Sequence, residues 1–62
     1  MYIIIIDTPI GLMFYDNKSQ TITNNFGDAT CFENIDAAND SLKNINIQYN
    51  KKIIPIFVMD NN

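Results

Sequence analysis

The chain has 62 residues, seven acidic and four basic side chains, one cysteine and no histidine, with a net charge of −3. An acidic balance with no basic stripe argues against direct nucleic-acid binding, and one cysteine excludes a disulfide within the chain. Without histidine, the sequence lacks the usual zinc ligands, and we expect no metal and no cofactor.

A single domain over residues 1–62 is near the lower size limit for an independent fold. A chain of this length buries only about 60% of its unfolded surface. Small domains usually compensate with disulfides, metals or association. Because the first two are excluded here, we expect self-association, a partner protein or unusually dense packing.

The first predicted element is a strand over residues 1–6, since "YIIII" is short and rich in β-branched residues. Pro9 cannot donate to a strand ladder and ends this run. A hairpin over residues 11–23 follows, with a polar turn at "DNKS". Alternation along its first strand puts Leu12 and Phe14 on one face, and Met13 and Tyr15 on the other.

The next segment, "NNFGDATCF", is rich in turn-forming residues. We expect a short turn that tucks Phe26 and Phe32 into the core, with an extended piece over residues 30–32. Free cysteine is among the most buried residue types, so Cys31 is predicted to be a small core residue.

A helix is predicted to begin at Asn34, because asparagine is among the best N-cap residues. Its apolar positions recur at helical spacing and form one stripe, whereas its charged positions fall on the opposite side. The stripe consists of Ile35, Ala38, Leu42 and Ile45, and the solvent face of Glu33, Asp36, Asp40 and Lys43.

The last predicted strand covers residues 52–59. Pro55 lies in the middle of this run and cannot donate a hydrogen bond. It therefore predicts an edge strand, or a strand whose missing donor points outward.

Together these elements predict an α+β fold in the order β-β-β-α-β, a small antiparallel sheet of three or four strands with one helix on one face. The first and last strands are apolar on both faces, as in strands that lie between two layers. We expect that Ile3, Ile5, Phe57 and Met59 need a second layer from another copy or a partner. The alternative is that the sheet twists until loops with Phe26 or Tyr49 cover them.

Catalysis is not expected, because a reactive thiol at Cys31 would need a base such as histidine. The carboxylates of Asp28, Glu33, Asp36 and Asp40 lack the spacing of a calcium-binding loop. We interpret them as a solvated face, with contact to a basic partner as the alternative.

The layout "YIIII…G…FY…TIT…DA" followed by an aromatic, a helix and "IIPIFV" resembles very small phage and prophage accessory proteins. The matching residues are Tyr2, Gly11, Phe14, Asp28, Ala29, Phe32, Ala37 or Ala38, and Leu42. This group shares a scaffold and no activity, so no site residue is implied. The resemblance implies a viral gene whose product blocks a host protein by binding it.

The functional hypothesis is therefore a non-enzymatic protein-binding module, a phage-encoded inhibitor of a host or defence protein. The alternative is a small assembly subunit that self-associates through its apolar sheet face. We expect a homodimer, a host protein partner or both, no membrane contact, and a location in the cytoplasm. The candidate interface residues are Tyr2, Ile5, Met13, Tyr15 and Phe57 on the sheet, and Glu33, Asp36 and Asp40 on the helix.

Overall fold

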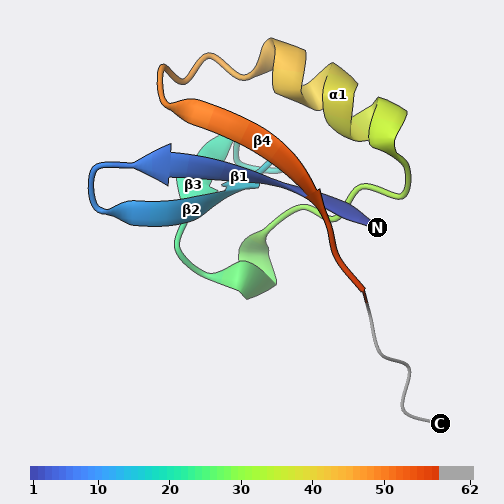
Figure 1. Cartoon of the computed structure of the whole chain (residues 1–62), viewed down its shortest axis with the longest axis horizontal. Coiled ribbons are helices and arrows are strands. Elements are labelled where there is room, and N and C mark those ends of the chain that lie inside the picture. Colours follow the sequence, from blue (N-terminus) through green and yellow to red (C-terminus); the bar gives the residue numbers. More distant parts are fainter. Residues whose placement is uncertain (58–62) are drawn as a thin grey trace, which may run out of the picture.

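The computed structural model describes residues 1–57, and the statements below refer to this part of the chain. Its elements are β1 (Tyr2–Thr8), β2 (Gly11–Asp16), β3 (Thr21–Thr23), a 3₁₀ turn η1 (Phe26–Asp28), α1 (Ile35–Asn44) and β4 (Asn50–Pro55). The strands form one antiparallel sheet in the order β3-β2-β1-β4. This is the predicted α+β fold in the predicted order of elements (Figure 1).

The first strand is longer than predicted because Thr8 completes a tight turn to β2. The Thr8 hydroxyl donates to the Gly11 carbonyl at 2.7 Å and accepts from the Ile10 N–H at 3.3 Å. Gly11 has a φ of 124°, a backbone angle that residues with a Cβ rarely adopt. A glycine at this position therefore lets β1 run on to Thr8 and reverse directly into β2.

Strand β2 divides its side chains between the two faces as predicted. Leu12 and Phe14 lie opposite Asp7 and Ile5 of β1, whereas Met13 lies opposite Ile6. Directly opposed residues share a face, so Leu12 and Phe14 belong to the Ile5 face and Met13 to the Ile6 face.

The main core lies between the sheet and α1. Ile4, Ile6 and Tyr15 form its buried centre. Partly buried side chains from the helix, the loops and the neighbouring strands pack around it, namely Ile22, Phe32, Leu42, Ile45, Ile47 and Ile53. Complete burial of a large apolar side chain, as at Ile4 and Ile6, contributes on the order of 1.5–3 kcal/mol.

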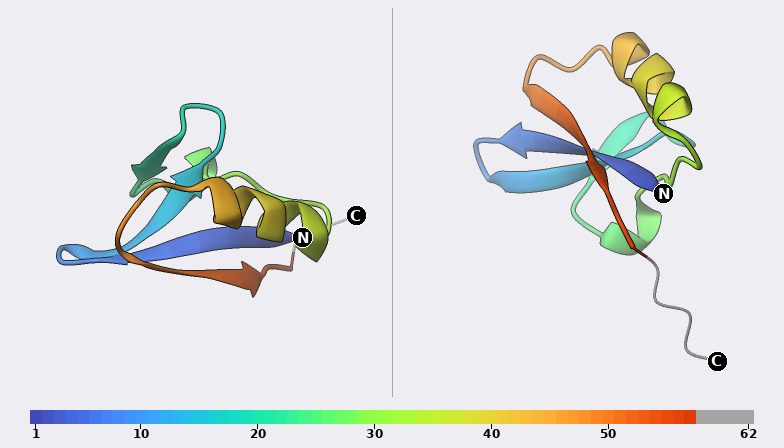
Figure 2. Two further views of the ribbon diagram at one scale, coloured as in Figure 1. Left: turned by 90° about the horizontal axis from the view of Figure 1, so that it is seen from above. Right: turned by 45° about the vertical axis from the view of Figure 1, so that its right-hand side comes forward.

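The opposite face is more enclosed than the sequence suggested. Within a single chain, Ile3 is only 1% exposed and Ile5 only 7% exposed. Figure 1 shows η1 on the side of the sheet away from α1, and Phe26 packs edge-to-face on Phe14 with ring centroids 5.4 Å apart. The sheet is strongly twisted, with β2 and β3 turning away from the line of β4 (Figure 2). The expectation that Ile3 and Ile5 need a layer from another molecule is therefore wrong.

Of the extended piece predicted over residues 30–32, the structure shows an isolated antiparallel bridge between Phe32 and Tyr2. The N–H of Phe32 donates to the Tyr2 carbonyl at 2.7 Å, and the Tyr2 N–H donates back at 2.8 Å. Phe32 packs against the core under α1, but Phe26 does not join it there and remains 52% exposed. Cys31 is exposed rather than buried, because neighbours in an extended segment point to opposite sides and Phe32 takes the inner side.

Strand β4 begins at Asn50, two positions before the predicted start, and ends at Pro55. Residues 58 and 59 of the predicted strand lie outside the described part of the chain. β4 pairs with β1 alone and is an edge, as Pro55 predicted. The Ile56 N–H donates to the Met1 carbonyl at 2.8 Å. Because the backbone N–H groups of successive residues in a strand point to opposite sides, the nitrogen of Pro55, which has no hydrogen, faces the open edge of the sheet.

Helix α1 begins where the N-cap predicted. The Asn34 side-chain oxygen accepts from the Ala37 N–H at 2.8 Å. Ala38 is completely buried on the sheet, and Leu42 and Ile45 are partly buried. Ile35, the fourth member of the predicted stripe, remains 48% exposed because it lies in the first turn, at the margin of the contact.

Replacing Asn34 with Ala is expected to lower the free energy of unfolding by about 1 kcal/mol, because the Ala37 N–H loses its acceptor. Urea unfolding followed by circular dichroism measures this change. Asn39→Ala, on the exposed side of the same helix, is the matched control and should be neutral or slightly stabilising. Equal losses in the two variants would contradict the capping role.

Candidate functional site

A polar cleft separates α1 from the turn between β2 and β3. Its volume is about 520 Å³. The apolar part of the lining consists of Tyr15, Phe32, Ala37, Ile45 and Ile47, and the polar part of Asn17, Gln20, Asp40, Ser41, Asn44 and Asn46. Four of these polar side chains are carboxamides, which can both donate and accept hydrogen bonds. The cleft thus combines apolar side chains with groups that can form hydrogen bonds to a polar, uncharged ligand such as a polypeptide main chain.

Hydrogen bonds hold the two walls of this cleft in place. The Asn17 N–H donates to the Thr30 hydroxyl at 2.8 Å, which ties the turn to the segment before α1. The Ser41 hydroxyl donates to the Asn17 side-chain oxygen at 3.4 Å, across the cleft. On the helix, the Asn44 side chain donates to the Asp40 carbonyl at 3.0 Å. The polar rim is therefore anchored to the fold at both sides.

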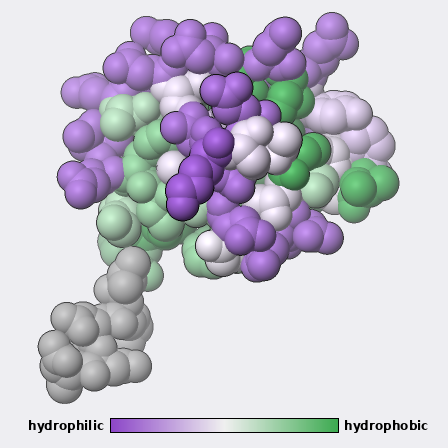
Figure 3. All heavy atoms as spheres, turned by 180° about the vertical axis from the view of Figure 1, so that it is seen from behind, coloured by the Kyte–Doolittle hydropathy of each residue, from purple (hydrophilic) through white to green (hydrophobic). Residues whose placement is uncertain are grey.

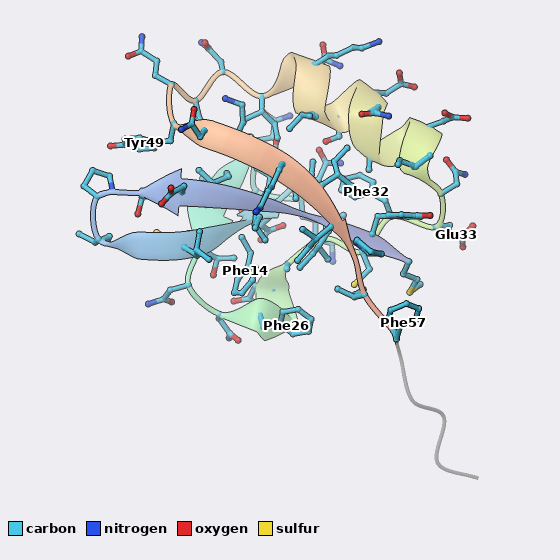
Figure 4. The ribbon with its side chains drawn as sticks, viewed as in Figure 1. Phe14, Phe26, Phe32, Glu33, Tyr49 and Phe57 are labelled. Atoms are coloured by element: carbon cyan, nitrogen blue, oxygen red, sulfur yellow. The ribbon has the colours of Figure 1, made fainter. Side chains whose placement is uncertain are left out.

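Of the acidic side chains predicted on the helix, Asp36 and Asp40 lie on α1, whereas Glu33 precedes the Asn34 cap and lies outside the helix. Glu33, Asp36 and Asp40 are all exposed, and Figure 4 shows Glu33 pointing away from the fold ahead of α1. Asp40 also lines the cleft. Lys43 is the only basic residue of the helix, so this side of the molecule presents mainly negative charge next to the polar rim.

The predicted sheet residues do not share one surface. Tyr2, Met13 and Tyr15 belong to the side of the sheet that α1 covers, whereas Ile5 belongs to the opposite side. Tyr15 and Ile5 are 6% and 7% exposed and act as core residues. Phe57 follows β4 and is 91% exposed. The prediction placed residues from both faces of the sheet on one surface. In a run of four isoleucines, no polar residue shows which face points to the core and which to solvent.

The sequence-based prediction missed several exposed apolar residues. Ile10 and Leu12 lie at and beside the β1–β2 turn, and Phe26 and Met1 are about half exposed. Figure 3 shows hydrophobic side chains near the β1–β2 turn and beside the end of β4, with hydrophilic ones over most of that view. The alternation that places Tyr15 in the core already assigns Leu12 to the opposite face, so this residue was predictable.

Other kinds of site find no support among residues 1–57. No group of three or more His, Cys, Asp or Glu side chains there is placed to hold a metal ion. In the same range no helix has the length and apolar character needed to cross a membrane. No protein-family model matches the chain, and no curated protein or solved structure resembles it closely enough to count as a match.

Proposed function

We propose that the protein is a non-enzymatic protein-binding module that inhibits a host or anti-phage defence protein in the host cytoplasm. The observation that carries this proposal is the polar cleft bordered by the acidic side of α1. The occupant that fits it is a polypeptide segment with a lysine or arginine.

The cleft chemistry favours a polypeptide over a small charged metabolite. Carboxamides at Asn17, Gln20 and Asn44 offer donors and acceptors that match the alternating N–H and C=O groups of a main chain. The lining residues Phe32 and Ile47 can receive one apolar side chain of the same segment.

Charge gives the second element of recognition. Asp40 at the cleft can pair with one basic side chain of the partner, while Asp36 and Glu33 extend the negative surface along α1. Complementary charges of this kind increase association rates and select against acidic partners. The proposed target surface is thus basic.

A second candidate function, a self-associating assembly subunit, is favoured by the exposure of Leu12 and Phe26 on the side away from α1. The two candidates use opposite sides of the sheet and can be tested separately.

Charge reversal tests the binding proposal. Asp40→Lys is expected to weaken binding at least about tenfold at low salt, because attraction becomes repulsion. Asp28→Lys changes the net charge equally at an exposed position outside the cleft and is the matched control.

The measurement is affinity capture from host lysate with wild type and both variants, followed by titration of the purified partner. Support requires a protein that wild type and Asp28→Lys retain and Asp40→Lys loses. Equal capture by all three, or no retained protein, would overturn the proposal.

A further inference from the structure

On the side of the sheet away from α1, a shallow hollow lies next to a protruding leucine. The hollow has a volume of about 200 Å³ and is lined by Ile5, Asp7, Leu12, Asn50, Lys51 and Lys52. Leu12 borders it and is 62% exposed. The surface therefore carries an apolar projection and a recess side by side.

Asp7 and Lys52 both border the hollow and carry opposite charges. Lys52 lies directly opposite Ile5, and Asp7 is two positions further along β1, directly opposite Leu12. Both charged residues are exposed. Asp7 and Lys52 are diagonal neighbours, whose Cβ atoms lie at most about 7–8 Å apart in an antiparallel pair.

We propose that this face binds a second copy of the chain in a two-fold symmetric homodimer. A two-fold axis in the plane of the contact, midway between Asp7 and Lys52, would place each Asp7 over the partner's Lys52. The same rotation carries each Leu12, which lies beside Asp7 on β2, to the margin of the contact next to the partner's Lys52. Such an isologous contact needs a self-complementary patch, and the pair of charges provides it.

Self-complementarity favours a second copy over an unrelated protein. A foreign partner needs only a surface that complements this one. A two-fold contact, in contrast, requires each charge to face its opposite across the axis, as Asp7 and Lys52 would. Association through the β4 edge is disfavoured because Pro55 there lacks the N–H that a pairing strand would accept from.

The contact must extend beyond the hollow. Stable interfaces bury about 800 Å² from each partner. Phe26 provides further exposed apolar area on this side through its packing on Phe14. The contact leaves α1 and the polar cleft facing outward, so it is independent of the proposed binding function.

A charge swap tests the proposed dimer in the full chain. Asp7→Lys and Lys52→Asp would each place like charges against one another, and each is expected to weaken dimerisation at least about tenfold. The double variant Asp7→Lys/Lys52→Asp restores opposite charges and should return the dissociation constant close to the wild-type value.

Sedimentation equilibrium over a range of concentrations measures these constants, with circular dichroism to show that each variant is folded. Lys43→Asp makes the same change as Lys52→Asp at an exposed position of α1, on the other side of the sheet, and is the matched control that should dimerise as the wild type does. A wild type that stays monomeric, single variants that still dimerise, or a double variant that stays monomeric would each overturn the proposal.

Discussion

Replacing Ile4 with Ala is expected to lower the free energy of unfolding by about 2–5 kcal/mol, the range for removing buried methyl and methylene groups from a core. Ile4 is completely buried at the centre of β1, where it lies opposite Ile53 and belongs to the cluster with Ile6 and Tyr15. Domain stability is typically only about 5–15 kcal/mol, and a chain this short should lie near the lower end. The variant should therefore be partly or fully unfolded at 37 °C.

The matched control is Ile10→Ala, the same chemical change at a residue that is 87% exposed in the β1–β2 turn. It should change the free energy of unfolding by less than about 0.5 kcal/mol. Urea unfolding measures both variants, and loss of a cooperative transition in Ile4→Ala counts as the expected result. A difference between the two variants below about 1 kcal/mol would contradict the assigned core.

Ala38→Leu is expected to destabilise the fold by about 1–3 kcal/mol, because a larger side chain forces α1 away from the sheet. Ala38 has no exposed surface, and the helix packs closely on the sheet at this point. A small residue is therefore required there, although leucine has a similar helix propensity.

Ala37→Leu, one position earlier on the same helix, is the control because Ala37 is exposed. The two variants have the same composition and differ only in the direction of the added side chain. Thermal unfolding should separate their midpoints by several degrees, as expected for a difference of about 1–3 kcal/mol in a small domain. Equal midpoints would show that α1 does not pack through Ala38.

Local chemistry made much of the fold predictable. The Asn34 cap depends on atoms within one helical turn, and the edge position of β4 follows from the missing donor of Pro55. The hairpin faces follow from alternation, so Leu12 and Tyr15 were assigned to opposite sides before the sheet was known.

Long-range contacts were not predictable in the same way. Residues 3–6 are all isoleucine, so no polar position shows which side α1 covers. Ile3 and Ile5 are buried on the side of the sheet where Phe26 of η1 packs on Phe14, a contact between residues 12 positions apart that no local pattern predicts. The polar cleft likewise joins residues near 17–20 to residues near 40–47, and no local pattern brings these together.

The position of β1 between β2 and β4 has a consequence for protein synthesis. Strands β1 to β3 can pair once residues 2–23 have left the ribosome, but the second neighbour of β1 comes from residues 50–55. During this interval the other edge of an isoleucine-rich strand stays open, and unpaired edges make nascent chains prone to aggregate. Protection of the growing chain should therefore be needed until β4 emerges, and a substitution that slows β4 pairing should reduce yield in the cell more than it reduces stability in the test tube.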